Sequence, residues 1–563
     1  MKFSEIPYER PDFEAAGRFY TEAAGRMEAA RSFEEAERVF LEVEAYAAGF
    51  DTMLTVAQIR HDIDTRDEFY DAEVAFIDSA SPKLEEHVQR WNAAMLATPY
   101  RAEFERKYNR LMFLNAEIEL RTFSPEIVSE LQRENALTTE YSKLIASAQI
   151  PFEGQVYTIS QLSPLKQDPD PERRAAAWSA ENAWYEENEQ RLDEIYSELV
   201  KLRDAMGKKL GYDAYTPLGY DRMVRNCYGK EGIESFRAAV REYIVPIATR
   251  VYEVVARRLG KSLPMGYADC AMWFPDGNAK PTGTPEEILA AGRRFYHELS
   301  GETAEFIDFM FENELFDVLS RPGKAGGGYC TSLQKYKAPF IFANFNGTSG
   351  DVEVITHEAG HAFAKYLARD IIPAESQWPS LEACEVHSMS MEFFAEPWAE
   401  SFFGADADKF RWQHLADALT FIPYGTLVDH FQHVCYEHPE YSAAERNAAW
   451  LELAGVYMPW LKPEESLGFY ASGRAWQRQR HIYESPFYYI DYCLAQTISL
   501  QFWAMLRHDK DAAWAKYMAY TRPAGTLTFL ELLEQAGLYS PFSPDTLRGV
   551  AEEASAWLAE QNL

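Results

Sequence analysis

The chain has 563 residues, of which 47% are apolar and 14% aromatic, so a disordered protein is excluded and more than one domain is possible. Its 55 Lys and Arg residues are outnumbered by 88 Asp and Glu residues, and the formal charge of −33 repels polyanions. Neither nucleic acid nor an anionic membrane is therefore an expected partner.

Two further features concern the compartment. No apolar stretch approaches the about 20 residues that a membrane span requires. The first residues contain no run resembling a signal peptide, and the six cysteines lack Cys-x-x-Cys spacing. We therefore expect free thiols and a cytoplasmic protein, and the sequence leaves its oligomeric state open.

The first 150 residues have the pattern of long helices with charged outer faces. Apolar side chains recur at helical spacing, as in Val39, Phe40, Val43 and Tyr46. Near residue 150 the composition changes to turn residues followed by a short alternating run. We expect an N-terminal helical domain over residues 1–150 and a second domain over residues 151–563.

Residues 260–350 are rich in Pro and Gly and contain short strand-like runs at 329–333 and 340–345. These runs predict a small sheet. An exposed edge of such a sheet could pair with an extended peptide through main-chain hydrogen bonds. From these residues alone, an ordinary structural strand is an equally good interpretation.

The most informative motif is His357-Glu358-Ala359-Gly360-His361. On a helix, two His residues four apart project from one face and form a half-site for zinc. Glu358 lies beside them, where it can reach a water held by the metal without binding the metal itself. Thr348 and Asp351 have the spacing of a capping box, and Pro373 lies beyond the far end, so we predict a helix over this motif.

A catalytic zinc site needs a third protein ligand. The segment from Pro379 to Glu392 reads as the next helix, and it carries four side chains that could serve. Spacing alone does not choose among these candidates, which are Glu382, Glu385, His387 and Glu392.

A second segment, residues 476–492, is unusually rich in Tyr and His. Tyr488 and Tyr492 are four residues apart, which places them on one face of a helix. Taken alone, such an aromatic cluster more often serves packing than catalysis.

The His-Glu-x-x-His motif followed by Glu385-x6-Glu392 resembles the zinc site of the thimet oligopeptidase family, in particular its oligoendopeptidase F branch. The run from Pro339 to Thr348 and the glycines at 326–328 resemble the family's strand, turn and loop beside the zinc helix. The resemblance implies a mainly α, two-lobed helical zincin, with a small β-sheet beside the zinc helix and a deep substrate channel. Residues 151–563 would then be the zinc metallopeptidase catalytic domain.

The resemblance also implies roles for particular residues. One Zn²⁺ per chain would be held by His357, His361 and Glu385, with Glu358 as general base and acid. The aromatic segment would stabilise the oxyanion and bind substrate, although the distance from His481 to Tyr488 departs from the thimet branch. The implied catalytic residues are Glu358, Tyr488, Tyr492 and His481, and the implied substrate-binding residues are Phe342, Asn344, Gly347, Tyr483 and Tyr489.

The implied activity is zinc-dependent hydrolysis of internal bonds in short peptides, which are the expected partners. Two alternatives remain at this point. One is a zinc carboxypeptidase, which would need a cation for the free C-terminal carboxylate. The other is a helical peptide-binding scaffold whose structural zinc is closed by a fourth ligand, such as His387 or Glu382.

Overall fold

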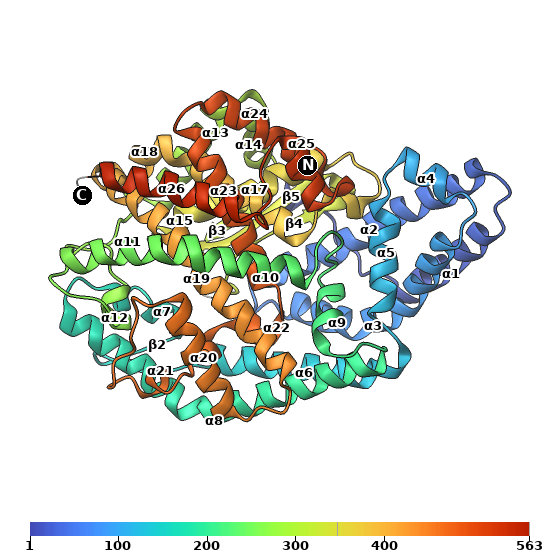
Figure 1. Ribbon diagram of the computed structural model, residues 1–563. Coiled ribbons are helices and arrows are strands. Elements are labelled where there is room, and N and C mark those ends of the chain that lie inside the picture. Colours follow the sequence, from blue (N-terminus) through green and yellow to red (C-terminus); the bar gives the residue numbers. More distant parts are fainter. Residues whose placement is uncertain (322, 346, 562–563) are drawn as a thin grey trace. The chain divides into compact units, whose positions relative to one another are not determined.

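The computed structural model describes residues 1–321, 323–345 and 347–561. Within these ranges the chain is mainly helical and contains two small β-sheets (Figure 1). The prediction of a mainly α fold is confirmed. The two lobes and the deep channel stay predictions.

The chain forms two compact units, and each collects segments that are far apart in the sequence. The predicted domain boundary near residue 150 stays a prediction. The first unit contains Met1–Leu120, Lys280–Ala405 and Met505–Leu538, and the second contains Arg121–Ala279, Asp406–Ala504 and Tyr539–Leu563.

The first unit begins with long helices, as the apolar spacing predicts. Their N-termini are capped by side chains: Asp12 accepts a hydrogen bond from the Ala15 amide, and Ser32 accepts one from the Glu35 amide. Their inward faces share one core that includes Phe40, and α1 packs against both α2 and α3. These elements are η1 (Phe3–Glu5), α1 (Phe13–Glu28), α2 (Phe33–Ile63), α3 (Glu68–Leu96), α4 (Arg101–Lys107) and α5 (Leu111–Arg121).

The first unit also holds the predicted small sheet, in the strand order β3-β5-β4. Its strands are β3 (Phe316–Leu319), β4 (Tyr329–Leu333) and β5 (Ala338–Phe345), with the 3₁₀ turn η5 (Gln334–Tyr336) between β4 and β5. The central strand, β5, runs parallel to β3 and antiparallel to β4. Since β5 is paired on both sides, an added peptide strand can extend this sheet only at β3 or β4.

The remaining helices of the first unit include the segment that carries the His-Glu-x-x-His motif. They are α13 (Pro285–Leu299), α14 (Gly301–Glu312), α15 (Gly350–Glu353), the π-helical turn η6 (Val354–Glu358), α16 (Ala359–Ala368), η7 (Ala374–Gln377), α17 (Leu381–Ala395), η8 (Glu396–Trp398), α18 (Ala399–Phe403), η9 (Gly404–Asp406), α24 (Lys510–Thr521), η11 (Ala524–Thr526) and α25 (Phe529–Ala536).

The second unit is helical apart from a hairpin at the predicted change of composition. Strands β1 (Ile150–Phe152) and β2 (Gln155–Tyr157) pair through a turn at Glu153 and Gly154, whose φ angles of +50° and +76° match a hairpin turn. The other elements are η2 (Pro125–Ile127), α6 (Val128–Ala146), α7 (Ile159–Leu162), η3 (Leu165–Gln167), α8 (Pro171–Lys209), α9 (Tyr215–Arg222), α10 (Lys230–Ala239), η4 (Val240–Ile244), α11 (Val245–Arg258), α12 (Tyr267–Cys270), α19 (Ala407–Glu437), α20 (Ala443–Tyr457), α21 (Gly468–Ala471), η10 (Ala475–Arg478), α22 (Arg480–Glu484), α23 (Tyr489–Leu506) and α26 (Pro544–Glu560).

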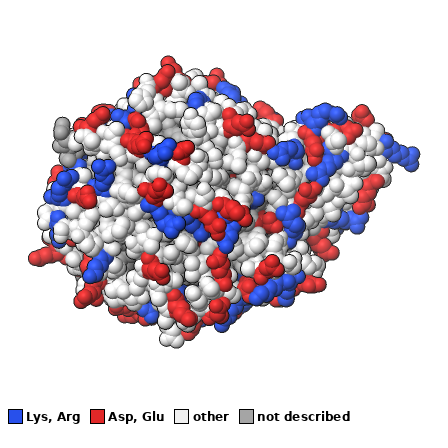
Figure 2. Space-filling view, viewed as in Figure 1, with Lys and Arg blue, Asp and Glu red and all other residues white. Residues whose placement is uncertain are grey.

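Charged side chains of both signs are interspersed over the face shown in Figure 2. All six cysteines are free thiols, as their spacing predicts. Among the described helices, none combines the length and the apolarity that crossing a bilayer requires.

Candidate functional site

The two His residues of the motif project from one continuous helical segment made of α15, η6 and α16. Their ring centroids are 5.0 Å apart, and the rings are nearly perpendicular. The segment starts at Gly350 with Ser349 at the N-cap, one residue later than expected, and the Asp351 carboxylate accepts from the Gly347 amide at 2.8 Å. The turn that carries His357 and Glu358 is π-helical, a widening that often marks functional sites.

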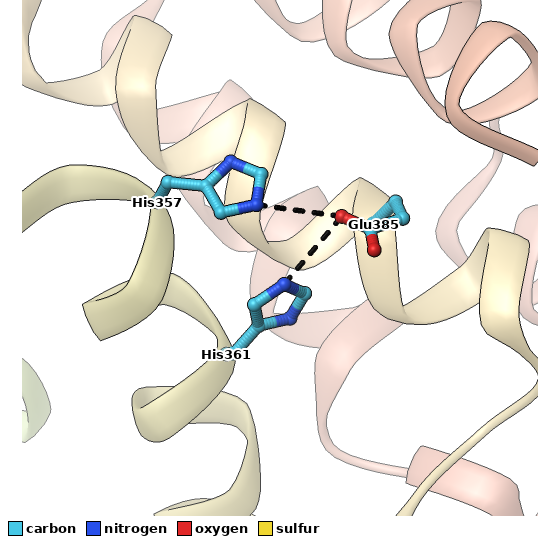
Figure 3. A group of neighbouring side chains, drawn as sticks. All are labelled: His357, His361 and Glu385. Atoms are coloured by element: carbon cyan, nitrogen blue, oxygen red, sulfur yellow. Dashed lines mark ion pairs between the residues drawn. The ribbon is translucent and has the colours of Figure 1, made fainter. Parts of the chain in front are cut away.

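Glu385 on α17 completes a group of three potential metal ligands (Figure 3). Its Oε2 lies 3.4 Å from His357 Nε2 and 3.5 Å from His361 Nε2. A tetrahedral ion with bonds of about 2.0–2.1 Å separates its donor atoms by about 3.3 Å. The spacing and chemistry of these donors therefore fit a zinc ion, and among the four candidates Glu385 is the one that approaches the Nε2 atoms of both imidazoles.

Two of the other candidates have different partners in the structure. Glu382 Oε1 accepts a hydrogen bond from Ser380 Oγ at 2.9 Å. The ring of His387 is buried and packs edge-on against Tyr520, with centroids 5.4 Å apart. These contacts leave His357, His361 and Glu385 as the three-donor group among the described residues.

Glu392 has a role that spacing did not reveal. Its Oε1 accepts a hydrogen bond from His357 Nδ1 at 2.7 Å. A proton fixed on Nδ1 leaves Nε2 as the nitrogen with a free lone pair, and Nε2 is the atom that faces Glu385. In a similar way, Ser388 Oγ donates to Glu385 Oε2 at 3.1 Å, which restrains the carboxylate.

Gly360, inside the motif, allows α16 and α17 to approach closely. A Cβ atom at this position would lie 2.8 Å from Ser388 Cα and 2.9 Å from His387 O. These distances are shorter than ordinary van der Waals contact, so a larger residue would push the helices apart. The glycine thus sets the distance at which Glu385 meets the two imidazoles.

The electrostatics of the group favour a positive charge between its members. Burial alone would raise the pKa of Glu385, but the neighbouring His361 and His357 hold it well below its usual range. Burial alone would lower the pKa of His357, but its hydrogen bonds with Glu385 and Glu392 hold it well above the usual value. Without a metal, a proton is held between the His357 imidazole and its carboxylate neighbours. A metal cation bound by the same donors would take the place of this proton.

Glu358 is half-buried at the C-terminal end of η6, directly after His357. The Cys330 thiol on β4 has its pKa raised well above the usual value, mainly by burial and next by the negative charge of Glu358. Helix α16, which begins directly after Glu358, packs against β4, an edge strand of the sheet.

The structure does not support Phe342 as a substrate contact. The Phe342 side chain is 0% exposed on the central strand, and its ring stacks on Tyr329 with centroids 5.1 Å apart. The role of Phe342 was implied by the family resemblance of this strand, and its contact with substrate stays a prediction that the burial of the side chain does not favour.

The other two residues predicted from this strand and turn organise the surrounding backbone. Asn344 Nδ2 donates to Ala325 O at 2.8 Å and to Gly327 O at 2.9 Å, so its side chain holds the glycine-rich loop. Gly347 adopts a left-handed φ of +84° at the turn into the metal-site helix. Contact of Asn344 and Gly347 with substrate stays a prediction.

In the second unit, four of the predicted aromatic residues form one cluster: His481 lies on α22, Tyr488 directly before α23, and Tyr489 and Tyr492 on α23. The His481 ring lies 5.7, 4.9 and 5.9 Å from the rings of Tyr488, Tyr489 and Tyr492, and Tyr488 lies 5.0 Å from Tyr492. All four side chains are half-buried. The structure thus brings His481 against all three tyrosines despite its distance from Tyr488 along the chain. We call these four residues the aromatic cluster.

Tyr483, by contrast, is a core residue. It is 0% exposed, stacks on Tyr141 at 4.0 Å, and donates its hydroxyl to Leu192 O at 3.3 Å. The burial of its side chain does not favour a contact with substrate, and that role, implied by the family resemblance, stays a prediction.

Comparisons with known proteins agree with this geometry. The family model described as peptidase M3 N-terminal domain matches residues 3–123, and the model described as peptidase family M3 matches residues 302–552. The comparison with curated proteins gave no match.

Among solved structures, the chain is 44% identical to a PZ peptidase A solved with an inhibitor, with a TM-score of 0.94 and 100% of each chain covered. It is 44% identical to a protein provisionally assigned as oligoendopeptidase F, with a TM-score of 0.94, covering 100% of this chain and 99% of the other. A Bacillus anthracis protein with the same provisional assignment is 42% identical, with a TM-score of 0.90 and the same coverage. The chain belongs to peptidase family M3 and is a metalloendopeptidase that resembles oligoendopeptidase F over its whole length.

Proposed function

We propose that this metallopeptidase is a zinc-dependent oligoendopeptidase, which cuts internal bonds of short peptides. The observation that carries the proposal is the donor geometry, with Glu385 Oε2 at 3.4 and 3.5 Å from the two imidazole Nε2 atoms. Two neutral imidazoles and one carboxylate are a ligand set of catalytic zinc sites, in which the fourth position stays open.

His357, His361 and Glu385 would hold one zinc ion per chain. When bound, zinc acts as a Lewis acid that lowers the pKa of a water towards about 7 and polarises the scissile carbonyl. Glu392 keeps the His357 Nε2 lone pair available through the hydrogen bond to Nδ1. The membership of this chain in family M3 and its full-length likeness to a structure provisionally assigned as oligoendopeptidase F support this assignment.

Glu358 is the proposed proton carrier. It follows a proposed ligand directly in the helical segment, and α16, which begins at the next residue, packs against β4, where an extended peptide could add to the sheet. It takes a proton from the attacking water and delivers it to the leaving amine, a role that contributes about 10²–10⁴-fold to rate.

The aromatic cluster is proposed to stabilise the negative charge that develops on the carbonyl oxygen. Tyr488 and Tyr492 carry phenolic donors, and His481 lies against both. One such donor is worth about 2.7–4 kcal/mol of barrier. Tyr489 completes the cluster and is proposed to contact the substrate. These roles rest on the family resemblance and on the gathering of the side chains.

A structural zinc site would require a fourth protein ligand. The two residues expected for this role, Glu382 and His387, are not part of the three-donor group found among the described residues. The three-donor group therefore favours an open, catalytic site.

The test combines metal analysis with peptide digestion. Purified protein should contain about one zinc per chain. It should cut a mixed library of short peptides at internal bonds, mapped by mass spectrometry, and leave denatured casein largely intact. Release of single C-terminal residues would identify a carboxypeptidase, whereas bound zinc without any cleavage would identify a structural site.

A further inference from the structure

The segment that leads into α23 contains a residue held in an unusual backbone conformation. Phe487 has a φ of +68°, in the left-handed region that non-glycine residues rarely adopt. Its side chain is 0% exposed and lies against the rings of Tyr220, His433 and Tyr436 at 5.5, 4.9 and 5.4 Å. A conformation of this kind persists only where its surroundings impose it.

Gly219 on α9 makes room for this ring. A Cβ at position 219 would lie 2.6 Å from Cδ2 of Phe487. The Phe487 ring therefore packs directly against the backbone of α9, and this close contact requires glycine at position 219.

Both main-chain polar atoms of Phe487 are held by buried side chains from distant parts of the chain. Gln432 Oε1 accepts from the Phe487 amide at 3.0 Å, while Gln432 Nε2 donates to Val428 O at 3.2 Å. Arg225 Nη2 donates to the Phe487 carbonyl. Gln432 and Arg225 therefore fix the peptide on each side of the residue before Tyr488.

Arg225 also holds the first turn of α23. The same Nη2 donates to Asp491 Oδ1 at 2.9 Å, and the Tyr228 hydroxyl donates to that oxygen at 3.2 Å. Asp491 directly precedes Tyr492 in the sequence. One guanidinium nitrogen thus ties the turn before Tyr488 to the turn that carries Tyr492.

Burying the Arg225–Asp491 ion pair costs the fold desolvation free energy. The Arg225 and Asp491 side chains are each 1% exposed. Arg225 Nε and Nη1 and Asp491 Oδ2 have no hydrogen-bond partner among the described residues. Replacing such a pair by apolar side chains is often neutral or stabilising, so stability alone gives a poor reason for it. A better reason for the buried pair is that it holds the two tyrosines in a single defined position.

We propose that Arg225, assisted by Gln432, is a positioning residue that fixes Tyr488 and Tyr492 for catalysis. The inference rests on the proposed function, which assigns the developing charge to these phenols. Arg225 itself need not touch substrate, since it acts through the backbone at Phe487 and through Asp491.

The test compares four variants by steady-state kinetics, zinc content and hydrogen exchange over residues 486–492. In Arg225→Met, kcat should fall about 10²-fold, because misplacing a catalytic group by about 1 Å costs that much, while KM and zinc content change little. Arg225→Lys should recover most of kcat, since one ammonium can donate to both acceptors. Gln432→Met should lower kcat and speed hydrogen exchange over residues 486–492. Because this variant leaves no unpaired buried charge, it tests the proposal even if Arg225→Met fails to fold.

The matched control is Arg174→Met. Arg174 is a buried arginine of the same unit that donates to Ala268 O at 2.8 Å and to Asp269 Oδ1 at 3.3 Å, and it supports α12 rather than α23. Arg174→Met should lower thermal stability and leave kcat and exchange over residues 486–492 unchanged. An equal loss of kcat in the control would mean that Arg225 acts only through general stability, and would overturn the proposal.

Combination with Tyr488→Phe and Tyr492→Phe separates this inference from the proposed function. If Arg225 acts through the two hydroxyls, adding Arg225→Met to the doubly substituted chain should cost no more than about twofold further. Low kcat in the Tyr variants with normal kcat in Arg225→Met and Gln432→Met would refute the positioning role and leave the proposed function intact. Normal kcat in the Tyr variants would refute the proposed role of the phenols, and this inference with it.

Discussion

In the proposed metal centre, formed by His357, His361 and Glu385, every donor comes from the helical segment of η6 and α16 or from α17. In the aromatic cluster, the side chains also come from one short stretch, which is α22, the first turn of α23 and the residue before it, but their position depends on Arg225, Gln432 and Gly219 from distant segments. Helical spacing and the packing of two successive helices at Gly360 fix the first arrangement, whereas contacts with segments far away in the sequence fix the second. Substitutions in the metal centre should therefore change metal binding, and substitutions around the cluster should change turnover with the metal retained.

The largest effect that separates the two regions is expected from Glu385→Ala. Loss of one of three ligands should remove most of the zinc. Turnover should fall by more than about 10²-fold, which is the largest loss expected when only a hydrogen-bond partner of a ligand is removed. Metal analysis after dialysis measures the loss. Glu382→Ala, on the same helix, is the control and should keep zinc; the reverse result would show that the ligand is misassigned.

Removing a phenolic hydroxyl should reduce turnover without affecting the metal. Phe at position 488 or 492 should lower kcat and kcat/KM together by about 10²-fold, because the hydroxyl acts mainly on charge in the transition state. Zinc content and Tm should stay nearly unchanged, since the ring and its packing remain. Normal peptide turnover by both variants would show that the cluster serves packing.

A weaker effect on the metal centre is expected from Glu392→Gln. The amide oxygen still accepts from His357 Nδ1 but carries no charge, so zinc affinity should fall by about tenfold, at the low end of outer-partner effects. Competition with a chelator of known affinity measures this change. Unchanged affinity would mean that Glu392 does not control the orientation or basicity of His357.

The smallest effect should come from Gly360→Ala. Its methyl group would meet Ser388 Cα at 2.8 Å, and overpacking of this kind costs about 1–3 kcal/mol. Tm and zinc affinity should both fall. Gly25→Ala, in α1 with nothing within 4 Å of the added Cβ, is the matched control and should be neutral or stabilising by about 0.5–1 kcal/mol. Equal responses at the two glycines would contradict the close approach of α16 and α17.

The same comparison explains how much could be predicted from sequence. The helical fold, the small sheet and the facing of His357 and His361 follow from periodicity and spacing. Spacing alone left four candidates for the third donor, because Glu385, His387 and their neighbours are distinguished only by how α17 packs on Gly360. The roles of Glu392 and Arg225 required three-dimensional contacts, and the burial of Phe342 and Tyr483 depended on strand order and on core packing that no local pattern encodes.

The most direct test of the central claim is the activity and zinc content of Glu358→Gln. The amide keeps the size of the side chain but removes the base, so zinc should remain at about one per chain while kcat falls by about 10²–10⁴-fold or more. This result would show that His357, His361 and Glu385 form a catalytic centre in which Glu358 carries the proton. Near-normal turnover by the zinc-loaded variant would contradict it.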